Sequence, residues 1–547
     1  MDLGFRLTVA GSLALAPLVP LGARLAYLQV LRHDNLSTRA SNEFARTAQE
    51  AAPRADLLDR QGRVLARSNP SWSCFVDKAM VKDPNAFGMK LAPILQLPAS
   101  HIARKTRAAV RFAWLKRSLT QEEHRKLVEA RVEGLGLVPK SERVYPNGDL
   151  ARGVLGLVGT EGQGLAGLEL SQDKRLSGRA RRLSMIRDGQ GRSIYKSVAD
   201  AGDEPEPLRL TLDRTAQFLA EEALREGGEK GQFKEGIVAI QDPRNGEILA
   251  MAAWPPNPLR NPLVQDAFEP GSTFKIVAAL AAVDEHVVRP DELFNGEGGQ
   301  YHLTSGVTIT DHEPAGNMTL SQIMEKSSNI GIAKVVERVG PSRFYRLART
   351  LGFGAKTGAP LPGESAGELK PLSDLTRVGL AVSSYGYGLA VSPLQMLGAY
   401  SAIANGGTLW EPKLIADGKP PVKVRRVASE RAVREIALML EGVVDHGTAA
   451  NARITGYRAA GKTGTARKID PLTRQYSSTA YTASFAGFLP ASSPRWTILV
   501  ILHEPKGAYY GGLVAAPIFA RVGSRLLTLE GLPPDRPADP AHATARR

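Results

Sequence analysis

The sequence is poor in the residues that build disulfides and metal sites. Its one cysteine, Cys74, excludes an intrachain disulfide, a cysteine-based zinc site and a C-x-x-C redox pair. The surrounding stretch, SWSCFVDK, alternates polar with apolar residues and predicts a buried strand residue rather than a nucleophile. The nine histidines form neither H-E-x-x-H nor H-x-H. We therefore expect no metal site and no cofactor.

Acidic residues are also in the minority, with 55 Asp and Glu against 70 Lys and Arg and a net charge of +15. Such a surplus is typical either of a solvated basic surface or of a protein with an anionic partner, such as nucleic acid, a membrane or a phosphate-bearing lipid. The sequence has no RNA-binding signature, no zinc finger, and no basic helix followed by heptads. We therefore expect no nucleic-acid partner.

The N-terminus carries an informative apolar run, LTVAGSLALAPLVPLGA, with 17 uncharged residues between Arg6 and Arg24. Apolar character resumes after Arg24, and about 20 such residues cross a bilayer. Pro17 and Pro20 weaken a helix without excluding one. A buried helix and a signal peptide cleaved near A-L-A (14–16) are the alternatives. We expect an uncleaved transmembrane anchor over residues 7–31.

The rest of the chain changes pattern near residue 208. Before it, residues 31–50 and 76–140 have helical patterns, PRADLLDRQGRVLA predicts short strands, and 142–169 is glycine-punctuated and rich in turns. After it, apolar runs predict a strand hairpin (236–254) and a fully buried helix (273–285). Two further strands (482–490 and 496–505) and a last helix (514–529) follow. This order indicates an α+β domain whose antiparallel sheet is covered by helices.

The stretch GYRAAGKTGTA (456–466) fits two incompatible patterns. One is G-x-x-x-x-G-K-[ST], the phosphate loop of nucleotide-binding proteins. The other is Lys462-Thr463-Gly464, the third motif of penicillin-recognising serine acyltransferases. A phosphate loop needs a buried strand before it and a helix after it. NARIT precedes the stretch and Pro471 follows soon after, so we favour the acyltransferase interpretation.

That interpretation requires S-x-x-K, S-x-N and K-[ST]-G in this order. S-x-x-K occurs at Ser171, Ser193 and Ser272, but only Ser272 opens an apolar helix. On a helix, Ser272 and Lys275 share one face, and the helix N-terminus favours a developing alkoxide. Lys275 can act as a base if burial and a nearby cation such as Lys462 lower its pKa.

The other two motifs follow in the required order. Ser327-Ser328-Asn329 comes after a helical stretch, where Ser327 can relay a proton and Asn329 can bind a substrate amide. K-T-G occurs at Lys356, in a loop of glycine and proline, and at Lys462, on a predicted strand whose edge can pair with an extended peptide. We therefore select the Lys462 copy.

These motifs and several longer stretches resemble class B penicillin-binding proteins, which are membrane-anchored peptidoglycan D,D-transpeptidases. The similarity covers nearly the whole chain and is greatest to the septal FtsI type, with the elongation type as the near alternative. It is carried by FEPGSTFK (268–275), KSSNIGIAK (326–334), SYGYGLAVSPLQM (384–396), AAGKTGTA (459–466) and YGGLVAAPIF (510–519).

The resemblance implies a residue-by-residue mechanism. Ser272 would be the acylated nucleophile and Lys275 would be the general base. Ser327 and Asn329 would form part of the proton-transfer route and of the peptide-binding site. Lys462 would belong to the catalytic set as well, and it would bind substrate together with Thr463, Gly464 and Thr465. Within that set Lys462 and Thr463 would bind the substrate carboxylate, and the backbone N–H groups of Ser272 and Thr465 would form the oxyanion hole. No cofactor is implied.

The resemblance also implies an organisation. We expect a cytoplasmic N-terminus (1–6) and a single-pass anchor in the cytoplasmic membrane (7–31). An irregular pedestal module of dimerisation type (32–205) follows. The chain then forms a periplasmic transpeptidase domain with a five-stranded antiparallel sheet (206–530) and a disordered tail (531–547). Substrates would be the stem peptides of a lipid-linked precursor or nascent glycan, with β-lactams as inhibitors. An FtsW-type membrane glycosyltransferase and other division proteins would be partners. A carboxypeptidase, a β-lactamase, and a non-enzymatic penicillin sensor or division scaffold are the alternatives.

Overall fold

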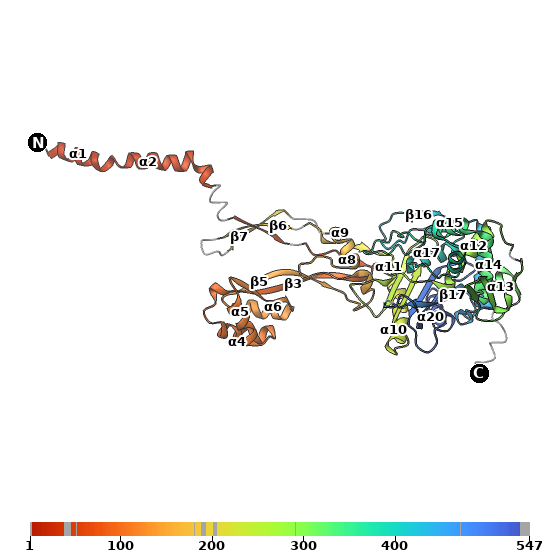
Figure 1. Ribbon diagram of the computed structural model, residues 1–547. Helices are drawn as coiled ribbons and strands as arrows, with labels where there is room; N and C mark the ends of the chain where they lie inside the picture. Colours follow the sequence, from red (N-terminus) through yellow and green to blue (C-terminus); the bar gives the residue numbers. More distant parts are fainter. Residues whose placement is uncertain are drawn as a thin grey trace. The chain divides into compact units, whose positions relative to one another are not determined.

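The structure is a computed structural model that describes residues 3–37, 45–50, 52–179, 181–187, 193–200, 205–289, 291–470 and 472–536. The chain forms two compact units, each built from separate segments (Figure 1). Unit 1 comprises Met1–Arg54, Pro70–Ser141 and Ser177–Pro205, and unit 2 comprises Ala55–Asn69, Glu142–Leu176 and Glu206–Arg547. The predicted boundary at residue 205 coincides with the last change from unit 1 to unit 2, but residues 55–69 and 142–176 of the predicted pedestal belong to unit 2.

The N-terminal apolar segment is helical but interrupted. Helix α1 (Leu3–Leu15) ends before Pro17, α2 (Leu18–Ala26) follows, and the π-helical turn η1 (Tyr27–Leu31) completes the run. Proline has no N–H to donate within a helix, which accounts for the break. Among the described residues, Gly511–Glu530 is the one helix long and apolar enough to cross a membrane, and it is partly buried in unit 2. Leu18–Leu31 is a shorter apolar helix, so the anchor over 7–31 stays a prediction.

The described residues of unit 1 form one complete sheet, part of a second sheet, and the helices α4, α5 and α6. One sheet has the order β1-β6-β7, and in the other β3 pairs with both β4 and β5. Helices α4 and α5 pack together over a core that includes Cys74, which is fully buried as predicted. The bounds are β1 Ala45–Glu50, β3 Val64–Asp77, α4 Pro84–Leu95, α5 Ala99–Ala108, β4 Phe112–Leu119, α6 Gln121–Ala130, β5 Leu135–Val144, β6 Arg181–Arg187 and β7 Ser193–Asp200.

The helical prediction for this region is only partly right. It holds for α4, α5 and α6 but is wrong at β1, at β4 and at the start of β5. These strands pair with segments far away in the chain, because β1 pairs with β6 and β4 pairs with β3. Local propensity does not report such pairing, which is decided by burial and by cross-strand neighbours. Residues 38–44 of the predicted 31–50 helix lie outside the described residues.

Two N-terminal segments belong to unit 2. Strand β2 (Leu57–Leu58) runs parallel to β8 (Leu208–Arg209), with Leu57 and Leu208 both fully buried. Short helices α7 (Arg152–Leu155), α8 (Gly167–Ser171) and α9 (Asp173–Ser177) come from the glycine-punctuated stretch. A buried ion pair fixes this region, because Arg143 Nε lies 2.7 Å from Glu169 Oε1 and the side chains are 4% and 0% exposed.

Removing one member of that buried pair is expected to destabilise the protein strongly. Glu169→Ala removes the carboxylate that pairs with the buried Arg143 guanidinium, a change that lowers the free energy of unfolding by about 3–5 kcal/mol. Urea unfolding followed by circular dichroism measures the loss. Asp291→Ala is the matched control, since its ion pair with Arg289 is exposed and is worth at most about 1 kcal/mol. Equal effects of the two substitutions would contradict the expectation.

The central sheet of unit 2 has five strands in the order β10-β9-β19-β18-β17, and every neighbouring pair is antiparallel. The predicted hairpin is confirmed as β9 (Glu235–Gln241) and β10 (Ile248–Trp254). The later strands are β17 (Ala460–Ile469), β18 (Tyr476–Leu489) and β19 (Trp496–His503). Strand β17 has a sheet neighbour on one side only, so its other edge is available for pairing.

Helices cover this sheet and enclose the main hydrophobic core. Helix α10 packs on β9 and β10 and contacts α20, while α17 packs on β9, β18 and β19. The predicted buried helix is confirmed as α12, whose first nine residues are all buried. The helices are α10 Arg214–Glu229, α11 Pro262–Gln265, α12 Lys275–Asp284, α13 Leu320–Lys326, α14 Asn329–Val339, α15 Pro341–Thr350, α16 Arg377–Ser384, α17 Pro393–Ala404, α18 Glu430–Asp445, α19 Gly511–Val514 and α20 Ala516–Leu529.

Chain segments beyond the sheet and main helices complete unit 2. Two-stranded pairs join β11 (Phe294–Asn295) to β14 (Asn317–Met318), β12 (Gln300–Thr304) to β13 (Val307–Thr310), and β15 (Thr408–Trp410) to β16 (Lys423–Arg426). After α20 the chain remains in contact with the rest of unit 2, because Arg458 N donates to Asp535 Oδ1 at 2.7 Å and Arg536 forms an ion pair with Asp445. The part of the predicted disordered tail that the structure describes, 531–536, is therefore packed.

Candidate active site

Ser272 lies in a tight turn directly before the buried helix α12. The turn η3 (Gly271–Phe274) follows Pro270, and Lys275 N donates to Ser272 O as α12 begins. Gly271 has φ +54° and donates to Gly386 O at 3.1 Å. A Cβ on Gly386 would lie 2.1 Å from Gly271 O, so the two glycines permit a backbone approach that larger residues would block. The half-buried Ser272 is thereby held at the N-terminus of α12.

Lys275 is fully buried and bonded to the second motif. Its Nζ donates to Ser327 Oγ at 3.1 Å, to Asn329 Oδ1 at 2.9 Å and to Ser327 O. Burial and the charge of Lys462 hold the pKa of Lys275 well below its ordinary value, against an opposing effect of Asp311. A neutral amine at this position can accept a proton from a hydroxyl. The structure therefore brings Lys275 of the first motif into contact with Ser327 and Asn329 of the second.

The second motif sits where one helix ends and the next begins. Ser327 caps α13 with a left-handed backbone, φ 59° and ψ 37°. Ser328 caps the start of α14, and its Oγ accepts from Gly331 N at 2.8 Å. Asn329 is the first residue of α14, and its Nδ2 donates to Thr310 O at 3.1 Å. The turn between two rigid helices thus fixes both polar side chains that face Lys275.

Asp311 supports this turn, and sequence reasoning missed it. Its Oδ1 accepts from the backbone N–H groups of Asn329 and Ile330, and its Oδ2 accepts from Ser328 Oγ. A carboxylate at a helix N-terminus satisfies free N–H groups and is favoured by the helix dipole. Asp311 follows β13, whose alternating sequence VTIT gave no signal of a catalytic neighbourhood. Its contribution depends on tertiary contact with α14.

Asp311→Asn is expected to slow acylation of Ser272 by penicillin about tenfold, because the amide cannot accept from all three donors and the negative charge beside α14 is lost. Stopped-flow acylation with a fluorescent penicillin measures the rate constant. Asp374→Asn, an exposed aspartate of the same unit, is the control and should leave the rate unchanged. An unchanged rate in Asp311→Asn would show that the turn holds without the carboxylate.

Lys462 and Thr463 lie in the interior of strand β17. Both are buried, and burial lowers the pKa of Lys462 to about 7. Lys462 Nζ lies 3.4 Å from Thr463 Oγ1, which in turn lies 2.9 Å from Thr448 Oγ1. Lys462 pairs with Ala486 of β18, and the strand continues to Ile469 without a helix. The phosphate-loop interpretation is therefore excluded.

Gly464 and Thr465 bring β17 against the turn that holds Ser272. A Cβ on Gly464 would lie 2.3 Å from Ser484 Oγ and 2.7 Å from Pro270 O, so only glycine fits. A Cβ on Gly271 would lie 2.9 Å from Thr465 O. This close packing places the Thr465 backbone beside the residue that precedes Ser272. Thr465 Oγ1 accepts from Gly511 N at 3.1 Å, which ties β17 to α19.

Aromatic residues line the far end of the β17 edge, and the motifs did not reveal them. Tyr387 accepts from Arg467 N at 3.2 Å through its hydroxyl and lies 3.5 Å from Thr465 O. Tyr476 donates to Glu269 Oε1 at 2.9 Å, and burial raises the pKa of that carboxyl. The rings of Tyr387 and Tyr476 meet edge to face at 5.6 Å. The Tyr387 hydroxyl therefore contacts backbone groups of β17 at both Thr465 and Arg467.

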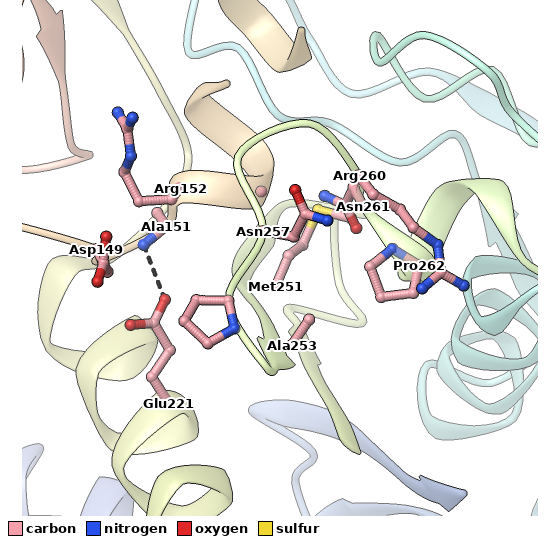
Figure 2. Close-up of a pocket in the computed structure, with 12 residues that line it drawn as sticks. Asp149, Ala151, Arg152, Glu221, Met251, Ala253, Asn257, Arg260, Asn261 and Pro262 are labelled. Carbon is pink, nitrogen blue, oxygen red and sulfur yellow. Dashed lines mark hydrogen bonds between the residues drawn. The ribbon is translucent and has the colours of Figure 1, made fainter. Parts of the chain in front are cut away.

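A separate small cavity of about 20 Å³ lies elsewhere in unit 2 (Figure 2). Glu221 from α10 faces it and accepts from Ala151 N at 2.8 Å and from Gln217 Nε2 at 2.7 Å. Burial raises the pKa of Glu221. The volume is sufficient for a water molecule but not for a peptide. None of the three-motif residues lines it, so it is not the catalytic centre.

An α+β fold that gathers a serine at a helix N-terminus, a buried lysine three residues later, S-x-N, and K-T-G on a sheet edge defines a serine acyltransferase of the penicillin-recognising class. The family model for the penicillin binding protein transpeptidase domain matches residues 236–523, and that for the penicillin-binding protein dimerisation domain matches residues 49–207. The chain belongs to the penicillin-binding protein transpeptidase family.

Relatives agree with this assignment over nearly the whole chain. Peptidoglycan D,D-transpeptidase FtsI of Escherichia coli K12 is 32% identical over 96% of this chain and 92% of its own length. Stage V sporulation protein D of Bacillus subtilis 168 is 31% identical over 91% of this chain and 82% of its own length. Penicillin binding protein 3 of Mycobacterium tuberculosis, solved with ampicillin, has a TM-score of 0.69 at 29% identity and covers 90% of this chain and 99% of its own.

Proposed function

We propose that this protein is a peptidoglycan D,D-transpeptidase that crosslinks stem peptides through an acyl-enzyme on Ser272. The observation that carries the proposal is the buried Lys275, which lies three residues after Ser272 and is bonded to Ser327 and Asn329. The relationship to the peptidoglycan D,D-transpeptidase FtsI of E. coli supports the reaction type. No observation of this kind favours the alternatives, which are a carboxypeptidase, a β-lactamase and a non-enzymatic penicillin sensor or division scaffold.

Acylation would begin when Lys275 Nζ takes the proton of Ser272 Oγ. The oxygen attacks the carbonyl carbon between the two terminal D-alanines, forming a C–O bond. The C–N bond then breaks, and the departing D-alanine nitrogen receives a proton through Lys275 and Ser327. An amine of a second stem peptide attacks the ester, forms the new amide and restores the Ser272 hydroxyl. Asn329 would orient the donor peptide's amide group.

Binding would use the edge of β17. The cationic form of Lys462, with Thr463 beside it, would hold the terminal carboxylate, and a bound carboxylate favours the charged lysine. The N–H groups of Ser272 and Thr465 would stabilise the oxyanion, which the close packing of Gly271 against Thr465 supports. An extended peptide can pair with the open strand edge. β-Lactams would acylate the same serine.

The cellular setting is part of the same proposal. We place the protein in the cytoplasmic membrane through residues 7–31, with its catalytic domain in the periplasm, at the division septum, beside an FtsW-type glycosyltransferase. The similarity of EPGST and of the Ser327-Ser328-Asn329 triplet to the septal type favours septal use, while elongation is the alternative. A fluorescent fusion distinguishes them, since septal use predicts a mid-cell band and elongation predicts signal along the side wall.

Product analysis tests the reaction directly. The full-length protein is incubated with polymerised lipid-linked precursor, and the digested glycan is separated by mass. A transpeptidase gives crosslinked dimers together with free D-alanine. Free D-alanine with only trimmed monomers would indicate a carboxypeptidase. Neither product, with penicillin still bound covalently, would indicate a sensor, and either outcome would overturn the proposed reaction.

A further inference from the structure

Unit 1 exposes large apolar side chains next to one another where β3 ends and β4 begins. Val110 is 98% exposed, Phe112 55% and Met80 52%. They lie together because Lys78 N donates to Arg111 O at 2.9 Å and Asp77 pairs with Phe112 across β3 and β4. An apolar cluster at this exposure is unfavourable in water and marks an interaction site.

Aromatic packing holds part of this cluster rigid. The ring of Phe112 meets Phe75 edge to face at 6.0 Å and Trp114 at 6.0 Å, and Phe75 meets Trp114 at 5.8 Å. A Cβ on Gly136 would lie 2.1 Å from the Phe75 ring, so this glycine makes room for the trio. Phe112 is therefore presented to its surroundings in a fixed position despite its exposure.

Basic residues surround the cluster. Lys78 Nζ donates to Arg107 O at 2.9 Å, and Arg111 is exposed between Val110 and Phe112. The Arg117 guanidinium lies 4.3 Å from the Trp114 ring. Residues 70–141 contain 13 Lys and Arg against six Asp and Glu. Of the nearby acids, Asp77 and Asp83 accept backbone N–H groups at the starts of η2 (Lys78–Met80) and α4.

We propose that this surface, the basic–aromatic tip formed by Lys78, Met80, Arg107, Val110, Arg111 and Phe112, docks on the surface of an anionic phospholipid bilayer. The cations meet lipid phosphates while Val110 and Phe112 enter the interfacial region, where aromatic residues are favoured. A soluble polyanion would account for the cations but not for the exposed apolar side chains. The proposed anchor would keep the tip near lipid, so a weak affinity suffices.

A dye at the tip tests the proposal in the full-length protein. Val110→Cys is labelled with the polarity-sensitive dye NBD, and the single native thiol reacts little because Cys74 is buried and its pKa is raised to about 11. The protein is reconstituted into vesicles of phosphatidylcholine alone or with 30% phosphatidylglycerol. We expect a blue-shifted emission and quenching by spin-labelled lipid in the anionic vesicles only, both reversed at high salt.

Charge reversal supplies the control. The triple change Lys78→Glu, Arg107→Glu and Arg111→Glu should abolish the shift, whereas Arg125→Glu with Lys126→Glu, on the exposed face of α6, should keep it. Identical emission in both vesicle types, or a shift that survives the triple change, would overturn the proposal. Vesicle flotation of the unlabelled protein measures membrane attachment through the anchor, and formation of crosslinked product measures the proposed function. Loss of lipid binding by the basic–aromatic tip can therefore be distinguished from loss of the anchor or of the enzymatic activity.

Discussion

Lys275→Met is expected to slow acylation by penicillin about 10³-fold, which is within the usual contribution of a general base. Lys275 Nζ is the basic group bonded to both Ser327 and Asn329 beside the serine, and methionine removes it while filling a similar volume. Because burial disfavours the charged amine, methionine should not lower the melting temperature. Stopped-flow acylation and thermal unfolding together separate lost chemistry from lost folding.

Lys275→Arg is the matched control for charge. Arginine keeps a cation at this position, but its pKa above about 12 prevents it from acting as a base. Acylation should therefore be slow in both variants. If Lys275→Arg retained a rate within tenfold of the wild type, the lysine would serve only as a positive charge, and the proton would have to leave Ser272 by another route.

The pH dependence of acylation should be bell-shaped, with the alkaline decline set by Lys462. The base Lys275 must be neutral, so the rate falls as pH falls through its lowered pKa. Lys462 must be cationic to hold the carboxylate, so the second-order rate falls as pH rises through about 7. The two lysines interact, and the observed values therefore belong to the pair.

Lys462→Arg tests the assignment of the alkaline decline. Arginine stays charged, so the decline should disappear up to pH 10 while the acid side of the profile remains. Lys462→Met should instead lower the rate by about 10²-fold below pH 7, where the wild-type lysine is cationic, because the carboxylate loses its ionic partner, and the two rates should converge at high pH. Second-order acylation rates between pH 5 and 10 measure all three proteins. An unshifted alkaline decline in Lys462→Arg would show that another group causes it.

The proposed catalytic serine and its lysine could be selected from the sequence because their relationship is local. Ser272 and Lys275 lie one helical turn apart, and the apolar sequence after them predicts a buried helix, so the spacing alone puts them on one face. Lys462 was separable from Lys356 for a similar reason, since its neighbours have strand character while those of Lys356 are rich in glycine and proline.

Asp311 and Tyr387 could not be found this way. Each acts through backbone groups of a segment that packs against it only in the folded chain, Asp311 on α14 and Tyr387 on β17. Neither contact leaves a periodic pattern or a fixed spacing. The composition of the two units escaped prediction for the same reason, because the pairing of Leu57 with Leu208 joins segments separated by most of unit 1.

Peptide mapping of the penicillin adduct tests most directly whether Ser272 is the acylated nucleophile. The protein is incubated with a penicillin, digested, and sequenced by tandem mass spectrometry. We predict a single adduct on Ser272, in the peptide that contains FEPGSTFK, and no adduct in Ser272→Ala. An adduct on Ser171, Ser193 or another residue, or undiminished labelling of Ser272→Ala, would show that Ser272 is not the nucleophile.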